Sequence, residues 1–357
     1  MRKLELDAKK WTILTLVSVV LILALFAAVT FITDPLLYYR KDSGIITYWH
    51  YNQLYSGPGV ARQYDYDTVI TGSSMVSEFD TSEFDKLYNA KTIKLTYNEA
   101  TAHNDKAILD VCFETHPNIK RVFLPIDSFT CIYKADQYNF PLPDYMYSKS
   151  AGNSVKYLLN LNIFYHITIQ DIVGTLKGKT QSAMRSKPEN NQYSSDWVQS
   201  FALIPWEKTE KLDTSDYLTN TDANLAENIL PLIEAHPDTE FIFFTPPYSM
   251  LYWYRRMGCA DAEASLESMR KMIGTCLQYD NVKVYGFGWD ETITTNLENY
   301  MDTGHFSPEI HSELLSRMYN DEDRITLDNC NQLFDSFIER VKTFDYAALY
   351  HSYVTKE

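Results

Sequence analysis

The chain has 357 residues, 45% of them hydrophobic, so it can bury one large core or two small ones. Its formal net charge is −15 and no basic patch is interleaved with aromatic residues, which argues against a nucleic acid partner. The five cysteines are scattered without a C-x-x-C pair, and no motif predicts a metal site, a disulfide framework or a cofactor.

The first predicted element is the apolar run WTILTLVSVVLILALFAAVTFI at residues 11–32. Its 22 uncharged residues are enough to cross a bilayer as a helix. Lysines and an arginine precede it, so the positive-inside rule predicts a cytoplasmic tail at residues 1–10, a single-pass location in the cell membrane and a large extracytoplasmic domain. The alternative is a cleaved signal peptide, although its apolar core is usually shorter, about 7–15 residues.

The segment after the apolar run, residues 33–66, is rich in tyrosine, and we interpret it as a juxtamembrane stalk. Gly57-Pro58-Gly59 predicts a turn within it.

Residues 67–76, DTVITGSSMV, then combine a short β-branched strand with a glycine turn. Gly72 ends the strand, and Ser73 and Ser74 follow at once. In open α/β folds the ligand crevice lies beyond the carboxyl ends of the strands, so these serines are candidates for catalysis. An ordinary glycine–serine turn is the alternative.

Strand and helix patterns alternate through the rest of the chain, which predicts a parallel sheet with helices on both faces. Five strands are expected, starting near residues 67, 91, 121, 240 and 282. Residues 128–220 break the alternation, and we expect an insertion that covers one side of the crevice. Residues 346–357 form a polar tail by composition.

Several polar side chains follow the predicted strand ends. Asp127 ends the third strand, where it either lines the site or forms a loop. Tyr248 and Arg255 follow the fourth strand, and aromatic rings beside an arginine suit either sugar or phosphate contacts or the edge of a core.

A second candidate motif lies near the end of the chain, in MDTGHFSP at residues 301–308. Asp302 and His305 are three residues apart, just before a helical pattern that starts near Pro308. A carboxylate at this spacing can orient the ring and favour the tautomer that accepts a proton from a serine.

An early G-S-S turn, a late D-x-x-H pair and the alternation between them resemble the SGNH/GDSL hydrolase superfamily over roughly residues 65–320. With the membrane helix, the chain is similar to the D-alanyl-lipoteichoic-acid esterase-like and alginate-acetylation-like branches. The resemblance implies a flavodoxin-like, three-layer α/β/α domain at residues 67–345, with five parallel strands in the order 2-1-3-4-5.

The resemblance also implies roles for individual residues. Ser74 takes the place of the nucleophile, with His305 and Asp302 as the other two members of a triad. Ser73 stands where the family commonly has Asp. Asn98, in TYNEAT, takes the place of the oxyanion donor but lacks the usual preceding glycine; the alternative is a cap of the next helix.

The implied function is a membrane-anchored serine esterase or O-acyltransferase that acts on acyl or acetyl groups of a cell-envelope polysaccharide. A membrane-bound O-acyltransferase is an implied partner. The alternatives are a catalytically inactive SGNH-fold protein that binds envelope glycan or an assembly partner, and a membrane-anchored sensor domain.

Overall fold

The computed structural model describes residues 8–50, 52–189, 191–196 and 208–354. The chain divides into two compact units, one of Met1–Tyr64 with Leu142–Met184 and the other of Asp65–Pro141 with Arg185–Glu357. This division differs from the expected stalk at 33–66 and insertion at 128–220, because the middle part of the insertion packs with the N-terminal residues. That the insertion covers the crevice stays a prediction.

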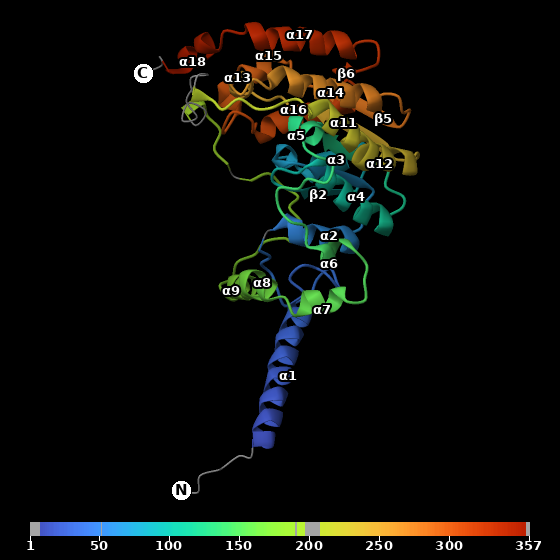
Figure 1. Ribbon diagram of the computed structural model, residues 1–357, viewed down its shortest axis with the longest axis vertical. Coiled ribbons are helices and arrows are strands. Elements are labelled where there is room, and N and C mark those ends of the chain that lie inside the picture. Colours follow the sequence, from blue (N-terminus) through green and yellow to red (C-terminus); the bar gives the residue numbers. More distant parts are fainter. Residues whose placement is uncertain (1–7, 51, 190, 197–207, 355–357) are drawn as a thin grey trace. The chain divides into compact units, whose positions relative to one another are not determined.

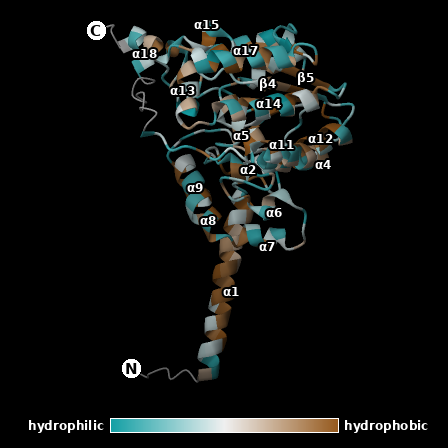
Figure 2. Ribbon diagram, turned by 45° about the horizontal axis from the view of Figure 1, so that its top comes forward, coloured by the Kyte–Doolittle hydropathy of each residue, from teal (hydrophilic) through white to brown (hydrophobic). Residues whose placement is uncertain are grey.

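The first unit is helical. Its longest helix, α1, runs through the apolar segment and is mostly brown in Figure 2; its length and composition allow it to cross a membrane, a property that signal sequences share. The helices of this unit are α1 (Ala8–Thr33), α2 (Gln53–Gln63), α6 (Asp144–Tyr147), α7 (Asn153–Leu158), α8 (Leu161–Ile163), η2 (Phe164–Thr168) and α9 (Ile169–Leu176).

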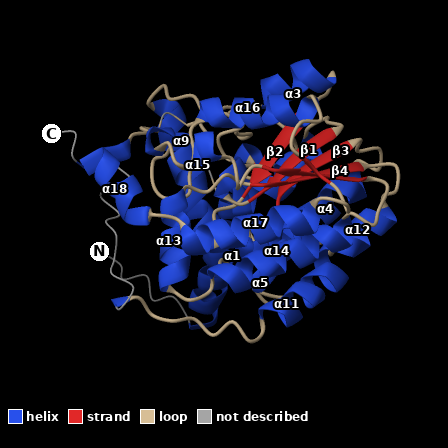
Figure 3. Cartoon of the chain, turned by 90° about the horizontal axis from the view of Figure 1, so that it is seen from above, coloured by secondary structure: helices blue, strands red, loops and turns tan. Residues whose placement is uncertain are grey.

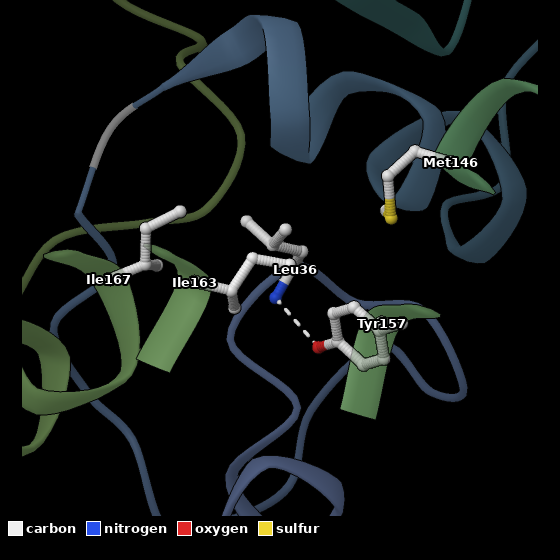
Figure 4. Close-up of a cluster of buried hydrophobic side chains, with 5 residues drawn as sticks. All are labelled: Leu36, Met146, Tyr157, Ile163 and Ile167. Atoms are coloured by element: carbon white, nitrogen blue, oxygen red, sulfur yellow. Dashed lines mark hydrogen bonds between the residues drawn. The ribbon is translucent and has the colours of Figure 1, made fainter. Parts of the chain in front are cut away.

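A small apolar core explains why the two segments of the first unit pack together. Figure 4 shows Leu36, just beyond α1, surrounded by Met146, Tyr157, Ile163 and Ile167 from the second segment. The backbone N–H of Leu36 donates to the Tyr157 hydroxyl at 3.4 Å. Residues more than a hundred positions apart therefore share one core.

The turn expected at Gly57-Pro58-Gly59 is wrong, because all three residues lie inside α2. Pro58 has no N–H to donate to the carbonyl of Leu54, four residues earlier. The hydroxyl of Tyr147 donates to that carbonyl instead, at 3.0 Å. A Cβ atom on Gly59 would lie 1.9 Å from the carbonyl oxygen of Leu36, so the glycine permits close packing here.

The second unit contains a mostly parallel sheet in the order β2-β1-β3-β4-β5-β6. The expected α/β class is confirmed, but the sheet has six strands rather than five, since a two-residue antiparallel strand pairs with β5. Two residues are too few to give a sequence signal. The strands are β1 (Thr68–Gly72), β2 (Thr92–Thr96), β3 (Arg121–Pro125), β4 (Glu240–Thr245), β5 (Val282–Gly286) and β6 (Arg324–Ile325).

Helices cover both faces of this sheet, so its central strands are buried. In Figure 3, α3 and α16 lie on one side of the strands, and α4, α12 and α14 lie on the other. The helices are η1 (Ser74–Val76), α3 (Thr81–Tyr88), α4 (Ala102–Thr115), α5 (Ser128–Ile132), α11 (Tyr217–Asn224), η4 (Leu225–Ile229), α12 (Leu230–Ala235), α13 (Met250–Gly258), α14 (Ala262–Cys276), α15 (Glu291–Thr294), η5 (Leu297–Asn299), α16 (Pro308–Tyr319), α17 (Cys330–Thr343) and α18 (Tyr346–Val354).

The final residues differ from the expected polar tail, because Tyr346–Val354 form α18. Tyr346 is buried, and its hydroxyl donates to the carbonyl of Val341 at 2.6 Å. This aromatic anchor holds the start of α18 against α17.

Candidate active site

The turn after β1 is shaped by Gly72, which has a φ of +135°. A Cβ atom here would lie 2.5 Å from the Cδ of Pro125 on the neighbouring strand, so only glycine fits. Ser73 follows in an extended conformation, and Ser74 begins the short helix η1. Strand β1 and this turn therefore place two serines at the carboxyl edge of the sheet.

The two serines have different environments. Ser73 is buried; its hydroxyl donates to Asp127 Oδ2 at 2.6 Å and accepts the Met75 N–H at 3.3 Å. Ser74 is partly exposed. Ser73 Oγ accepts the Met75 N–H and the Ser73 carbonyl accepts the Val76 N–H, whereas no bond from the Ser74 N–H to another described residue is seen.

Ser74, His305 and Asp302 form a continuous hydrogen-bonded chain. Ser74 Oγ lies 2.7 Å from His305 Nε2, and His305 Nδ1 lies 2.6 Å from Asp302 Oδ2. The other oxygen of Asp302 accepts the backbone N–H groups of Gly304 and His305, both at 2.7 Å. The carboxylate is thereby fixed, and it favours the tautomer with the proton on Nδ1 and a free acceptor at Nε2.

The charges around His305 raise its pKa above the ordinary value. Burial lowers the pKa, but the hydrogen bond and charge of Asp302 and the charges of Asp127 and Glu78 together raise it by more. For Asp302, burial raises the pKa, but the bonds and charge of His305 and the Gly304 N–H lower it by more. The net pKa of Asp302 is therefore below its ordinary value. The pair therefore stabilises a protonated imidazole next to Ser74.

Asp127 connects the ends of three neighbouring strands. It follows β3, accepts the Ser73 hydroxyl from the β1 turn, and accepts the Tyr248 hydroxyl from the loop after β4 at 2.5 Å. Burial raises the pKa of Asp127, and its two hydroxyl donors act in the opposite direction. The sequence left open whether Asp127 lines the site or forms a loop. In the structure, Asp127 is a buried residue that connects strand ends beside Ser74.

Further contacts hold the loop that carries His305 over the sheet. The Tyr300 hydroxyl donates to the carbonyl of Pro247 at 2.6 Å, and the Ser249 hydroxyl donates to the carbonyl of Thr303 at 2.6 Å. These contacts fasten the loop after β5 to the loop after β4. Their partners follow predicted strands, which is the only sequence signal that could have indicated them.

His311 contacts the turn that carries Ser74. It is buried in α16, and its Nε2 lies 2.9 Å from the carbonyl oxygen of Met75, while its Nδ1 lies 2.9 Å from that of Ser307. Burial lowers its pKa to about 4, so the ring is neutral and donates to one of these carbonyls at a time. No motif in the sequence indicated a role for His311.

Two other predicted residues, Asn98 and Arg255, are exposed. Gly72 pairs in register with Thr96, so Asn98, two residues further on, lies at the same sheet edge as Ser74, and it is exposed. It does not cap α4, whose capping box consists of Thr101 and Asn104. Arg255 is an exposed residue of α13, and no contact links it to Ser74.

The described residues contain no group of three or more His, Cys, Asp or Glu side chains that could hold a metal ion. Comparison of the chain with protein-family models, curated proteins and solved structures gave no match.

Proposed function

We propose that the chain is a serine esterase or O-acyltransferase of the SGNH type, anchored in the cell membrane by α1, that acts on acyl or acetyl groups of a cell-envelope polysaccharide. The observation that carries this proposal is the chain from Ser74 Oγ through His305 to Asp302, with distances of 2.7 and 2.6 Å. An ester-cleaving serine requires this arrangement of nucleophile, base and orienting carboxylate.

The reaction begins when Ser74 Oγ attacks the ester carbonyl and His305 Nε2 takes its proton. Asp302 stabilises the imidazolium that forms. The Ser74 N–H and the side chain of Asn98 are the proposed donors to the oxyanion. His305 then gives its proton to the departing alcohol, and an acyl group remains on Ser74.

The acyl group on Ser74 is resolved by water in hydrolysis or by a sugar hydroxyl in transfer. In either case His305 takes the proton of the attacking hydroxyl and gives it to Ser74 Oγ as the bond between Ser74 and the acyl carbon breaks. The His305 side chain is 32% exposed, so the site is reachable from the surface. That accessibility fits an ester carried on a polymer, which cannot be fully enclosed. A membrane-bound O-acyltransferase fits the role of acyl donor.

A fluorophosphonate probe tests the nucleophile directly in the full chain, purified in detergent. We expect labelling of the wild type, and loss of labelling in Ser74→Ala and His305→Ala. Hydrolysis of an activated acetyl ester should fall by about four to six orders of magnitude in Ser74→Ala, because nucleophile and base act as a unit.

Ser77→Ala is the matched control, since Ser77 lies three residues away and its hydroxyl contacts Glu78 at 3.1 Å. It should be labelled like the wild type. An unlabelled wild type, or undiminished labelling of Ser74→Ala, would contradict the proposal. Adding excess oligosaccharide to the ester assay then separates the two reactions, since only transfer yields an acylated sugar.

A further inference from the structure

The helical segment Leu161–Leu176 has an apolar outer face. Leu161, Tyr165, Val173 and Leu176 are 63%, 58%, 40% and 81% exposed, at spacings that place them on one side of a helix. The opposite side, with Ile163 and Ile167, packs into the core of the first unit. A helix with one side in water normally carries polar residues there, so this face is suited to another environment.

Helix α7 and the residue that follows it add two more side chains of the same kind. Val155 and Leu159 lie one turn apart and are 58% and 38% exposed. We call the whole set the apolar collar: Val155, Leu159, Leu161, Tyr165, Val173 and Leu176. An exposed apolar surface of this kind marks a site of interaction with a protein or a membrane.

The collar is fixed beside the end of α1. The rings of Phe26 in α1 and Phe164 in η2 are 4.3 Å apart. Beyond α1, the Asp34 carboxylate accepts the N–H groups of Tyr38, Tyr39 and Arg40 at 2.9–3.0 Å and the hydroxyl of Tyr157 in α7 at 2.9 Å. Both η2 and α7 are therefore attached to the last turns of α1.

The aromatic residues of α1 indicate the depth in a bilayer at which Phe26 and Phe164 lie. Trp11 is 61% exposed near the start of the apolar run, and the Phe31 ring contacts that of Tyr39 near its end, at 4.9 Å. Twenty residues separate Trp11 and Phe31, which is about 30 Å along a helix and matches the hydrocarbon thickness. Tyr side chains favour membrane interfaces, and Phe26 lies five residues before Phe31, about 7.5 Å along the helix. Phe164, beside Phe26, therefore lies just inside the interface near Tyr39.

The charge around the collar differs from that of the whole chain. Residues 33–64 and 142–184 contain seven Lys or Arg against four Asp or Glu, whereas the chain has a net charge of −15. Two of the four acids, Asp34 and Asp171, are buried. Lys156 and Lys177, next to collar residues, are exposed. A basic rim around an apolar face is typical of helices that lie in a membrane surface.

We propose that the apolar collar is a membrane-binding surface: α7 and the segment Leu161–Leu176 lie in the head-group layer of the bilayer that α1 crosses, with lysines against anionic head groups. The surface requires α1 to span the membrane and does not depend on the proposed esterase activity. Its role is to hold the first unit at a fixed depth.

The test measures quenching of a fluorophore by spin-labelled lipids, with the full chain in nanodiscs that hold one copy each. In a Cys259→Ser background, single cysteines replace Leu161, Leu176, Leu21 in the middle of α1, or Leu327. Leu327 is the matched control, being 50% exposed but in the second unit. We expect severalfold stronger quenching at Leu161→Cys and Leu176→Cys than at Leu327→Cys. In discs without anionic lipid, quenching at both collar positions should be weaker than in discs that contain it.

The Leu21→Cys variant separates the possible failures. Quenching there without excess quenching at the collar positions would overturn the collar while keeping the membrane span. No quenching at Leu21→Cys would overturn both. If the fluorophores at the collar positions are shielded only in discs that hold several copies, a second copy of the chain is the occupant of the collar. That result would also overturn the proposal.

Discussion

At the scale of single residues, the contact between Asp302 and His305 determines the expected pH dependence. His305 must be neutral to accept the Ser74 proton. Its pKa is raised above the ordinary 6.5, because the bond and charge of Asp302, together with the charges of Asp127 and Glu78, outweigh the effect of burial. The rate of fluorophosphonate labelling should therefore fall as the pH drops through a midpoint above 6.5.

Asp302→Asn removes the charge that raises this pKa, so the midpoint should move to lower pH. The maximal rate should also fall by about 10⁴-fold, because the ring loses its tautomer and orientation. The same midpoint in wild type and Asp302→Asn would show that another group controls the rate.

The buried bond between Tyr248 and Asp127 leads to a prediction about stability. Tyr248→Phe leaves a buried carboxyl oxygen without its donor, which should lower the free energy of unfolding by about 1–3 kcal/mol at pH 8. The bond lowers the pKa of Asp127, so its removal raises the folded-state pKa further. The loss should shrink as the pH falls and the carboxyl becomes protonated.

Chemical unfolding of the full chain in detergent, at pH 8 and pH 4.5, measures this difference. Tyr138→Phe, at a tyrosine that is 46% exposed, serves as control and should stay within about 0.5 kcal/mol of wild type. An equal loss for Tyr248→Phe at both pH values would contradict the assigned role of Asp127.

The sequence could indicate Asp302 and His305 together, because an i, i+3 pair is visible in the chain itself. It could not assign Asp127, whose partners Ser73 and Tyr248 are 54 and 121 positions away. Those contacts depend on which strands are neighbours, and the residue types alone do not specify the strand order.

At the scale of elements, the turn after β1 should be intolerant of a side chain. Gly72→Ala places a Cβ against Pro125 at a φ of +135°, which we expect to cost about 1–3 kcal/mol or more and to slow labelling of Ser74. Gly274→Ala is the control: it lies in α14 with nothing within 4 Å, and it should stabilise the fold by about 0.5–1 kcal/mol. Thermal unfolding and labelling rates measure both; a tolerated Gly72→Ala would show that the turn can relax.

Elements with a strong local pattern were predicted well. The five parallel strands begin at, or one residue after, the expected positions 67, 91, 121, 240 and 282, since a β-branched or aromatic run is a local property. The helix α2 was missed, because Pro58 and its flanking glycines disfavour a helix locally. Close packing of Gly59 and the donor from Tyr147 compensate, and both come from distant residues.

At the scale of the whole molecule, the division into two units was not predicted, because the shared core of Leu36 and Tyr157 joins segments far apart in sequence.

The proposed topology has a direct test. In the part of the chain that the structure describes, no disulfide joins the five cysteines; four of them are buried, and Cys259 is partly exposed. A membrane-impermeant maleimide should therefore label wild-type protein in intact cells, and Cys259→Ser should not be labelled. Labelling that appears only after permeabilisation would place the second unit in the cytoplasm.

The contact between Phe26 and Phe164 has a consequence for any shortened form of this protein. Removing α1 to obtain a soluble form of the chain would uncover the Phe164 ring next to side chains that are already exposed, such as Leu161 and Tyr165. Such a product would keep its fold but tend to self-associate, and its sedimentation would depend on concentration. Solubility would then be recovered by polar substitutions at Leu161 and Leu176, rather than by moving the point of truncation.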